Sequence, residues 1–180
     1  MKIRPYSRIV VEGMDGSGKT TLVKQLEEYL GDRGHFVPGY NRIKDDKPPM
    51  QQWWMEQLAE NPINQIVVHD RFFYPELVYG PILRGRMNMD PSTRSYVQNY
   101  LRLHGFLIYC RPPTYVVAEE VTKEKQMEGV HGKFHELLIK YDQIMIDEAP
   151  FYNGRFAKYD WTADSGLTDL LKRLTLYIYE

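Results

Sequence analysis

The chain has 180 residues and a mass of 21.3 kDa, a length that suits one domain with a single substantial core. Hydrophobic residues make up 43% and charged residues 26% of the sequence, proportions that exclude the composition of a disordered chain. The formal net charge is −1, so the basic excess that usually accompanies binding to polymeric nucleic acid is absent, and such a partner is not expected.

The N-terminal part predicts a strand, a glycine-rich loop and a helix. Residues 8–12 are mostly β-branched and end at Gly13, and apolar residues recur at helical spacing over residues 20–30. Gly31 and Gly34 follow this helix, and we expect them to end it.

The rest of the chain alternates helices with strands. The predicted segments are a strand over residues 35–37, a polar loop over 38–49, a helix over 50–60, a strand over 63–69 that ends at Asp70, helices over 74–86 and 90–104, a strand over 106–110, helices over 112–126 and 129–149, a strand over 155–161 and a helix over 167–177. This order predicts one α/β domain over residues 1–180 with a parallel, doubly wound sheet of about five strands.

Apolar runs such as residues 65–69 and 106–110 are strand-sized and too short to cross a bilayer. The N-terminal sequence lacks the apolar region of a signal peptide, so we expect a cytoplasmic protein without a membrane partner. Cys110 is the only cysteine, and its place at the end of an apolar run favours a small buried hydrophobe over a catalytic thiol.

The segment GMDGSGKT, residues 13–20, matches the G-x-x-x-x-G-K-[ST] phosphate-binding motif and lies between the predicted strand and helix. In such a loop, backbone N–H groups and the helix N-terminus hold phosphates, the lysine reaches the outer phosphates and the hydroxyl binds Mg²⁺. The alternative is a glycine-rich turn with an incidental Lys-Thr pair. The predicted ATP-binding residues of this segment are Gly13, Asp15, Gly16, Ser17, Gly18, Lys19, Thr20 and Thr21.

Asp70 and Arg71 follow the strand predicted over residues 63–69. In an open α/β sheet the carboxyl ends of the strands border the ligand crevice, so Asp70 is placed to hold metal or a metal-bound water, and Arg71 to hold phosphate. The alternative is a strand-end aspartate that caps a turn beside a solvated arginine.

EGMDGSGKTT at residues 12–21, followed by DRF at residues 70–72 and Tyr79, resembles the thymidylate kinase family of nucleoside monophosphate kinases within the P-loop kinase superfamily. The resemblance implies a P-loop NTPase fold with a small helical lid near residues 111–130. It further implies a magnesium- and ATP-dependent kinase that phosphorylates a deoxynucleoside 5′-monophosphate, with thymidylate or a related pyrimidine as acceptor. A homodimer and a bacteriophage source, hence a host-cytoplasmic location, are further expectations.

Carried over by position, the resemblance implies that Asp15 contacts the acceptor's sugar and that Arg71 holds the acceptor's phosphate. Lys19 and Thr20 would serve the donor phosphates and Mg²⁺, and Asp70 would organise metal and water. Some members of the family have a basic residue directly after the loop aspartate, whereas this chain has Gly16. Positive charge is therefore expected from the lid.

Three basic residues near the predicted lid are candidates for contacting the transferring phosphate. Lys123 and Lys125 belong to a charge run for which a solvated helix face is the alternative. Arg111, which we count among the ATP-binding residues, has the bidentate fork that lysine lacks.

A base and its sugar phosphate need flat apolar partners and a few polar contacts. Residues 161–165 follow the last predicted strand and would lie near the donor's adenine in this fold, although they also resemble an ordinary helix entry. For the acceptor side, core packing or solvated surface is the alternative for each candidate. The predicted acceptor-binding residues are Asp15, Arg42, Trp53, Arg71, Phe72, Tyr79 and Arg84.

Two other functions remain open at this point. A kinase that acts on a deoxynucleoside, a modified base or a polynucleotide end would use the same donor site. A regulatory NTP-binding switch would hydrolyse its nucleotide slowly and act through conformation.

Overall fold

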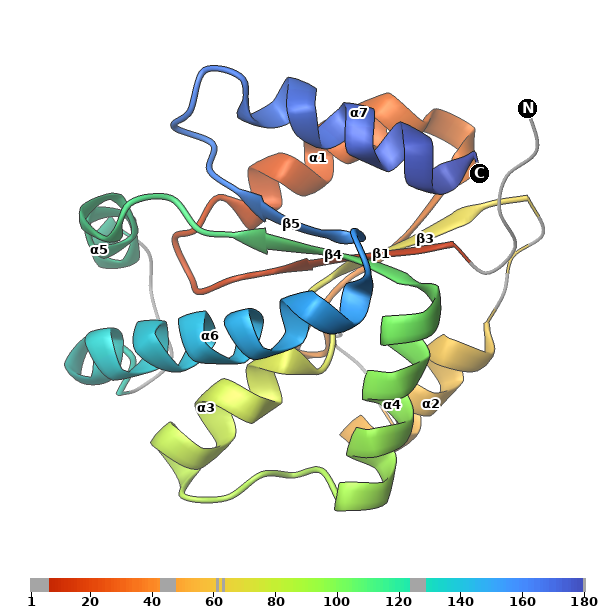
Figure 1. The fold of residues 1–180 in the computed structure, drawn as a ribbon. Helices are drawn as coiled ribbons and strands as arrows, with labels where there is room; N and C mark the ends of the chain where they lie inside the picture. Colours follow the sequence, from red (N-terminus) through yellow and green to blue (C-terminus); the bar gives the residue numbers. More distant parts are fainter. Residues whose placement is uncertain (1–6, 43–47, 61, 63, 124–128, 180) are drawn as a thin grey trace.

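The computed structural model describes residues 7–42, 48–60, 62, 64–123 and 129–179. Strands and helices alternate along the chain and form a sheet covered by helices on both faces (Figure 1). The strands are β1 (Arg8–Glu12), β2 (Gly34–Val37), β3 (Ile66–Asp70), β4 (Gly105–Cys110) and β5 (Phe156–Tyr159). The α-helices are α1 (Lys19–Leu30), α2 (Met50–Ala59), α3 (Tyr74–Arg84), α4 (Pro91–His104), α5 (Thr114–Lys123), α6 (Phe134–Glu148) and α7 (Gly166–Ile178).

All neighbouring strands pair in parallel, in the order β2-β3-β1-β4-β5. The central strand β1 is buried along its whole length, as expected for a parallel sheet covered on both faces. The predicted fold class, a P-loop α/β fold with a five-stranded parallel sheet, is confirmed. Because β1, β3 and β4 run in the same direction, the residues that follow them meet at one edge of the sheet.

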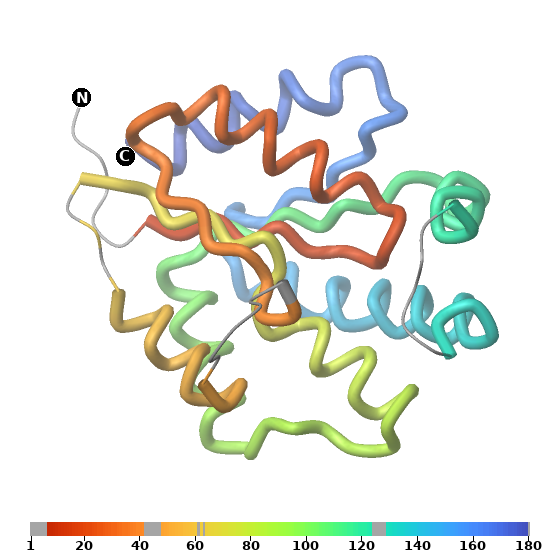
Figure 2. Tube along the Cα trace, turned by 180° about the vertical axis from the view of Figure 1, so that it is seen from behind, coloured from red at the N-terminus to blue at the C-terminus, as the bar shows by residue number. Residues whose placement is uncertain are grey.

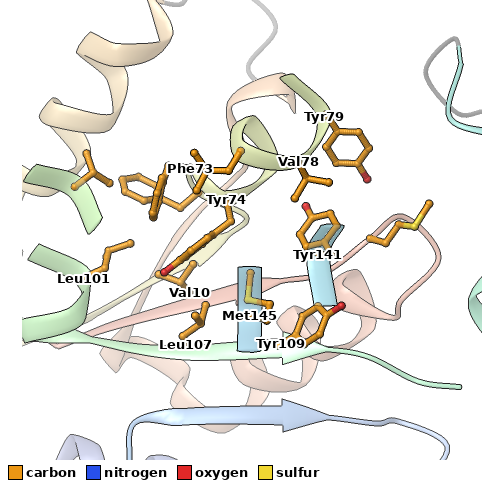
Figure 3. Packing of buried hydrophobic residues seen from close by; sticks show 14 of the residues in the cluster. Val10, Phe73, Tyr74, Val78, Tyr79, Leu101, Leu107, Tyr109, Tyr141 and Met145 are labelled. Carbon is orange, nitrogen blue, oxygen red and sulfur yellow. The ribbon is translucent and has the colours of Figure 1, made fainter. Parts of the chain in front are cut away.

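Side chains of β1 alternate between two apolar cores. Val10 belongs to the core on the side of α2, α3, α4 and α6, whereas Ile9 and Val11 belong to the core on the side of α1 and α7. Figure 3 shows the first core, in which Tyr79 of α3 and Tyr109 of β4 lie on either side of Tyr141 of α6. The Tyr79 and Tyr141 ring centroids are 5.9 Å apart, and those of Tyr109 and Tyr141 are 6.3 Å apart. These three tyrosines pack α3 and α6 against the sheet.

Element boundaries differ from the predicted ones where local turn chemistry acts. The helix predicted to reach residue 86 ends at Arg84, because Gly85 adopts a left-handed conformation with φ 67°. The strand predicted to reach Trp161 ends at Tyr159, because the Asp160 carboxylate accepts hydrogen bonds from the backbone and hydroxyl of Thr162. Where one helix was predicted over residues 129–149, a 3₁₀ turn precedes α6.

Among the residues described, no helix combines the length and the apolar character needed to span a bilayer. Cys110 lies in the sheet with no exposed surface, and burial raises the pKa of its thiol to about 12. This agrees with its interpretation as a small buried hydrophobe.

Candidate nucleotide-binding cleft

The loop between β1 and α1 has the backbone conformation that a phosphate-binding loop requires. Gly13, Gly16 and Gly18 have φ values of 146°, 74° and 87°, which disfavour residues with a side chain. A Cβ at Gly13 would lie 2.5 Å from the Cys110 carbonyl oxygen, so β4 leaves no space for one. Helix α1 begins at Lys19 without a side-chain cap, and its positive end therefore faces the loop.

Lys19 folds back over this loop. Its ammonium donates to the Met14 carbonyl and, at 3.4 Å, to the Ser17 hydroxyl. The side chain is 4% exposed, and burial together with the neighbouring Arg71 guanidinium lowers its pKa to about 8. An ammonium group is thus held inside the loop by the Met14 carbonyl and the Ser17 hydroxyl.

A second charged group lies beside the loop. The Arg71 guanidinium, at the end of β3, forms an ion pair with the Asp15 carboxylate, and the Tyr79 hydroxyl donates to the other Asp15 oxygen at 3.3 Å. Burial alone would raise the pKa of Asp15, but Arg71 and Lys19 hold it below its usual value. Burial opposes the charge on Arg71, and Asp15 restores it, so the pKa of Arg71 is raised. Both groups stay ionised near neutral pH.

These groups line one cleft of about 400 Å³, a volume within the range of small-molecule sites. Trp161 forms part of its wall, since a Cβ at Gly18 would lie 2.5 Å from the indole ring. Helix α5 lies beside the loop in both views of the fold (Figure 2), and a Cβ at Gly16 would lie 2.9 Å from Cβ of Glu120. The lining residues are Asp15, Gly16, Gly18, Lys19, Thr20, Thr21, Gln25, Arg71, Glu120, Tyr159 and Trp161.

Two side chains with oxygen donors would hold a magnesium ion if one binds here. Thr20 lines the cleft, and Asp70 is buried at the carboxyl end of β3, opposite Val11 in the register of β1. In the described part of the chain, no three His, Cys, Asp or Glu side chains are grouped as a metal site. Mg²⁺ takes hard oxygen ligands and usually keeps several waters, needing only one or two protein ligands besides phosphates. A hydroxyl and a carboxylate match that chemistry, and of the two, Thr20 lines the cleft whereas Asp70 is not among the lining residues.

Several predicted site residues lie away from the cleft lining. Arg111 pairs with Asp142 of α6 at 2.8 Å and 3.0 Å, and Arg84 pairs with Glu76. Lys123 pairs with two glutamates of its own helix, at 2.8 Å and 2.9 Å. Lys125 is outside the described residues, as is the side chain of Arg42 at the end of the 3₁₀ turn Tyr40–Arg42.

The aromatic candidates divide between core and site. Trp53 and Phe72 are each 4% exposed, and their ring centroids lie 5.6 Å apart in the apolar core. Tyr79 is also buried, but its hydroxyl reaches Asp15 at the cleft. Of the three, only Tyr79 has a polar contact with a cleft residue among the described interactions.

Three residues that line the cleft, and one buried carboxyl group beside it, are not indicated by any motif in the sequence. Gln25, Glu120 and Tyr159 line the cleft from α1, α5 and β5, and no motif marks them. Glu12 is fully buried at the end of β1 and accepts a hydrogen bond from the Phe72 backbone. The signal for Glu12 in the sequence is a charged residue directly after the apolar residues 9–11.

Comparisons with known proteins find distant relatives and a shared fold. No protein-family model matches the chain. A probable thymidylate kinase of Sulfurisphaera tokodaii is 25% identical over 172 residues, covering 77% of this chain and 86% of that protein. A probable thymidylate kinase of Metallosphaera sedula is 23% identical over 167 residues, covering 77% of this chain and 83% of that protein. These are distant sequence relatives.

Among solved structures, the YorR protein of Bacillus subtilis in complex with phosphorylated GDP superposes with a TM-score of 0.71 and 17% identity, covering 94% of this chain and 96% of that one. Deoxyadenosine kinase of M. mycoides with bound dATP has a TM-score of 0.62 and 15% identity, covering 94% of this chain and 99% of that one. At these identities the structural likeness establishes the fold, and the sequence relatives place the chain near the nucleotide kinases.

Proposed function

We propose that this chain, a distant relative of thymidylate kinases within the P-loop nucleotide kinases, transfers the γ-phosphoryl group of ATP to a deoxynucleoside 5′-monophosphate. One observation carries the proposal. A phosphate-binding loop holding Lys19 opens into the same cleft as the ionised Asp15–Arg71 pair. A donor triphosphate and an anionic acceptor can therefore meet in one enclosed volume.

Lys19 and the backbone of the loop would bind the donor phosphates, and Thr20 and Asp70 would hold Mg²⁺. The metal, when bound, neutralises charge that develops on the transferring phosphate. Arg71 would bind the acceptor phosphate with its guanidinium fork. Asp15, freed from part of its contact with Arg71, would accept a hydrogen bond from the acceptor's sugar.

The charge of the cleft favours a monophosphate over a nucleoside as acceptor. A nucleoside hydroxyl must lose a proton as it attacks, so a kinase of nucleosides needs a carboxylate base, whereas a monophosphate oxygen is already ionised near neutral pH. Asp15, the carboxylate within the loop, is paired with the Arg71 guanidinium, and that cation suits an anionic acceptor. The likeness to thymidylate kinases supports a pyrimidine base.

We also propose that the segment near residues 111–130, of which residues 124–128 lie outside the described part of the chain, acts as a lid. Helix α5 already packs on the loop through Glu120, and closure over the phosphates would exclude water, which would otherwise hydrolyse ATP. Lys123 would exchange its partners Glu119 and Glu120 for the donor phosphates on closure.

The test is a screen with ATP labelled at the γ-phosphate against deoxynucleosides, their 5′-monophosphates and oligonucleotides. We expect label in a deoxynucleoside diphosphate, only when Mg²⁺ is present. Label in a monophosphate or at an oligonucleotide end would replace the proposal with a nucleoside or polynucleotide kinase. Slow hydrolysis that no acceptor accelerates would indicate a regulatory switch.

A further inference from the structure

The turn that carries Arg71 has an unusual backbone. Arg71 has φ 70°, a left-handed conformation that residues with side chains rarely adopt. Such a conformation is strained and persists only when the surroundings impose it. The conformation also sets the direction in which the guanidinium leaves the chain, toward Asp15.

Groups from two other segments hold this turn. The Arg71 N–H donates to the Val11 carbonyl of β1 at 3.0 Å, and the next N–H, that of Phe72, donates to the Glu12 carboxylate at 2.8 Å. From the segment after β2, Gly39 packs so closely that a Cβ there would lie 2.7 Å from the Asp70 carbonyl oxygen. The backbone on both sides of the Arg71 Cα is therefore fixed by β1.

The Glu12 side chain is the one side-chain group in this set. It is fully buried, with 0% exposure, and its second oxygen has no hydrogen-bond partner among the described residues. Burying a carboxyl group with only one of its oxygens satisfied is costly. An apolar residue at this position of the central strand would avoid that cost. The cost is offset by the hydrogen bond that the Glu12 carboxyl oxygen accepts from the turn, at the Phe72 N–H.

We propose that Glu12 is a positioning residue, whose buried carboxyl group accepts the Phe72 N–H and thereby holds Arg71 in the conformation that directs its guanidinium into the cleft. Glu12 itself does not line the cleft, so it acts through Arg71. The assignment of Arg71 as the residue that binds the acceptor's phosphate rests on the proposed function.

The test compares Glu12→Gln, which keeps an acceptor oxygen at the same place, with Glu12→Leu, which removes it at similar size. We expect the Gln variant to retain the wild-type KM for the acceptor monophosphate within about threefold. The Leu variant should raise that KM about tenfold, the equivalent of losing roughly 1.4 kcal/mol, while the Kd for ADP changes less than about threefold. Ile9→Ala, a buried change on the same strand, serves as the control for lost stability.

A double-mutant cycle separates this role from a general structural one. If Glu12 acts through Arg71, adding Glu12→Leu to Arg71→Ala should raise the acceptor KM little further, because the positioned group is already gone. Additive losses, or equal losses in the Gln and Leu variants, would overturn the proposal.

Hydrogen exchange tests the positioning role independently of any enzymatic activity. The Phe72 amide should exchange at least about tenfold faster in Glu12→Leu than in Glu12→Gln, since only the former lacks the acceptor. Equal exchange rates would refute the role of Glu12 even if the kinase activity is present. If the Leu variant does not fold, Glu12→Val takes its place with the same expectation. A wild-type protein without monophosphate kinase activity would instead contradict the proposed function and leave this comparison to decide the role of Glu12.

Discussion

At the scale of single residues, the cleft depends on charges kept inside the protein by their neighbours. Lys19 is held on the Met14 carbonyl and the Ser17 hydroxyl, and Arg71 is held on Asp15. Each of these contacts occupies a group that a phosphate would bind more strongly. The side chains of Lys19 and Arg71 are thus ordered in the absence of a ligand. They therefore lose little conformational freedom when a ligand binds.

Removal of Lys19 should affect turnover far more than folding. We expect Lys19→Ala to lose about 3–4 kcal/mol of transition-state stabilisation, on the scale of other single charge-stabilising groups. Lys24→Ala, an exposed change on the same helix, is the matched control and should stay within about twofold of wild type. The measurement is the steady-state kcat/KM of both variants. Equal activity of Lys19→Ala and Lys24→Ala would contradict the assignment of Lys19 to the donor phosphates.

Glu12 should make stability depend on pH in a defined direction. Burial raises its pKa from 4.5 to about 7, although the Phe72 N–H, Arg71 and Lys19 oppose the shift and Asp70 adds to it. Between these two values the folded protein binds more protons than the unfolded chain, so the contribution of Glu12 to stability is lost as pH rises through about 7. The advantage of wild type over Glu12→Gln should therefore shrink from about pH 5 to about pH 8 in urea unfolding. An advantage that grows with pH would show that the pKa is depressed instead.

The positions of the loop residues follow from the sequence because the turns that set them are local. The motif at residues 13–20 encodes its own turns, so Asp15, Lys19 and Thr20 come to the cleft together. The positions of Arg111 and Trp53 depend instead on partners far along the chain. Arg111 meets Asp142, and Trp53 meets Phe72. No spacing in the sequence indicates those contacts.

At the scale of secondary-structure elements, a buried polar network joins the helices of one face. The Glu148 carboxylate, at the end of α6, accepts hydrogen bonds from Arg102 of α4 at 2.7 Å and 3.0 Å and from the Tyr74 hydroxyl of α3 at 3.1 Å. Glu148 is 3% exposed. A single carboxylate therefore fixes three helices relative to each other, including α3, which carries Tyr79 to the cleft.

Loss of this carboxylate should destabilise the protein. We expect Glu148→Ala to lower the free energy of unfolding by about 2–4 kcal/mol, because Tyr74 and Arg102 lose a buried partner while Arg102 retains some access to water. Asp147→Ala, at the neighbouring exposed position, should change stability by less than about 0.5 kcal/mol. Urea unfolding of the two variants gives the comparison, and similar midpoints would argue against the network.

The sequence predicts the order of helices and strands, because the spacing of apolar residues and the positions of glycine, proline and capping residues mark them. Helix α4 begins at Pro91 and is capped by Asp90, whose carboxylate accepts hydrogen bonds from the backbone N–H groups of Ser92 and Thr93 at 2.9 Å, as the sequence indicates. Helix and strand ends that depend on tertiary contacts are harder to predict from the sequence. The 3₁₀ turn His131–Lys133 interrupts a segment whose apolar spacing is helical throughout.

At the scale of the whole molecule, the sheet brings distant segments to one edge. Loop residues after β1, Arg71 after β3 and Trp161 after β5 line the same cleft, and helices α1 and α7 cover one face while α3 and α6 cover the other (Figure 1). The strand order places β1 at the centre of the sheet. Binding of a nucleotide should therefore stabilise the entire domain and not only the loop.

The most direct test of the account is a calorimetric titration of ATP into the wild-type protein and into Lys19→Ala, with and without Mg²⁺. The account predicts binding to the wild type at a single site, strengthened by Mg²⁺, and a Kd raised at least about tenfold in Lys19→Ala. A folded wild-type protein that binds neither ATP nor GTP in the presence of Mg²⁺ would contradict it.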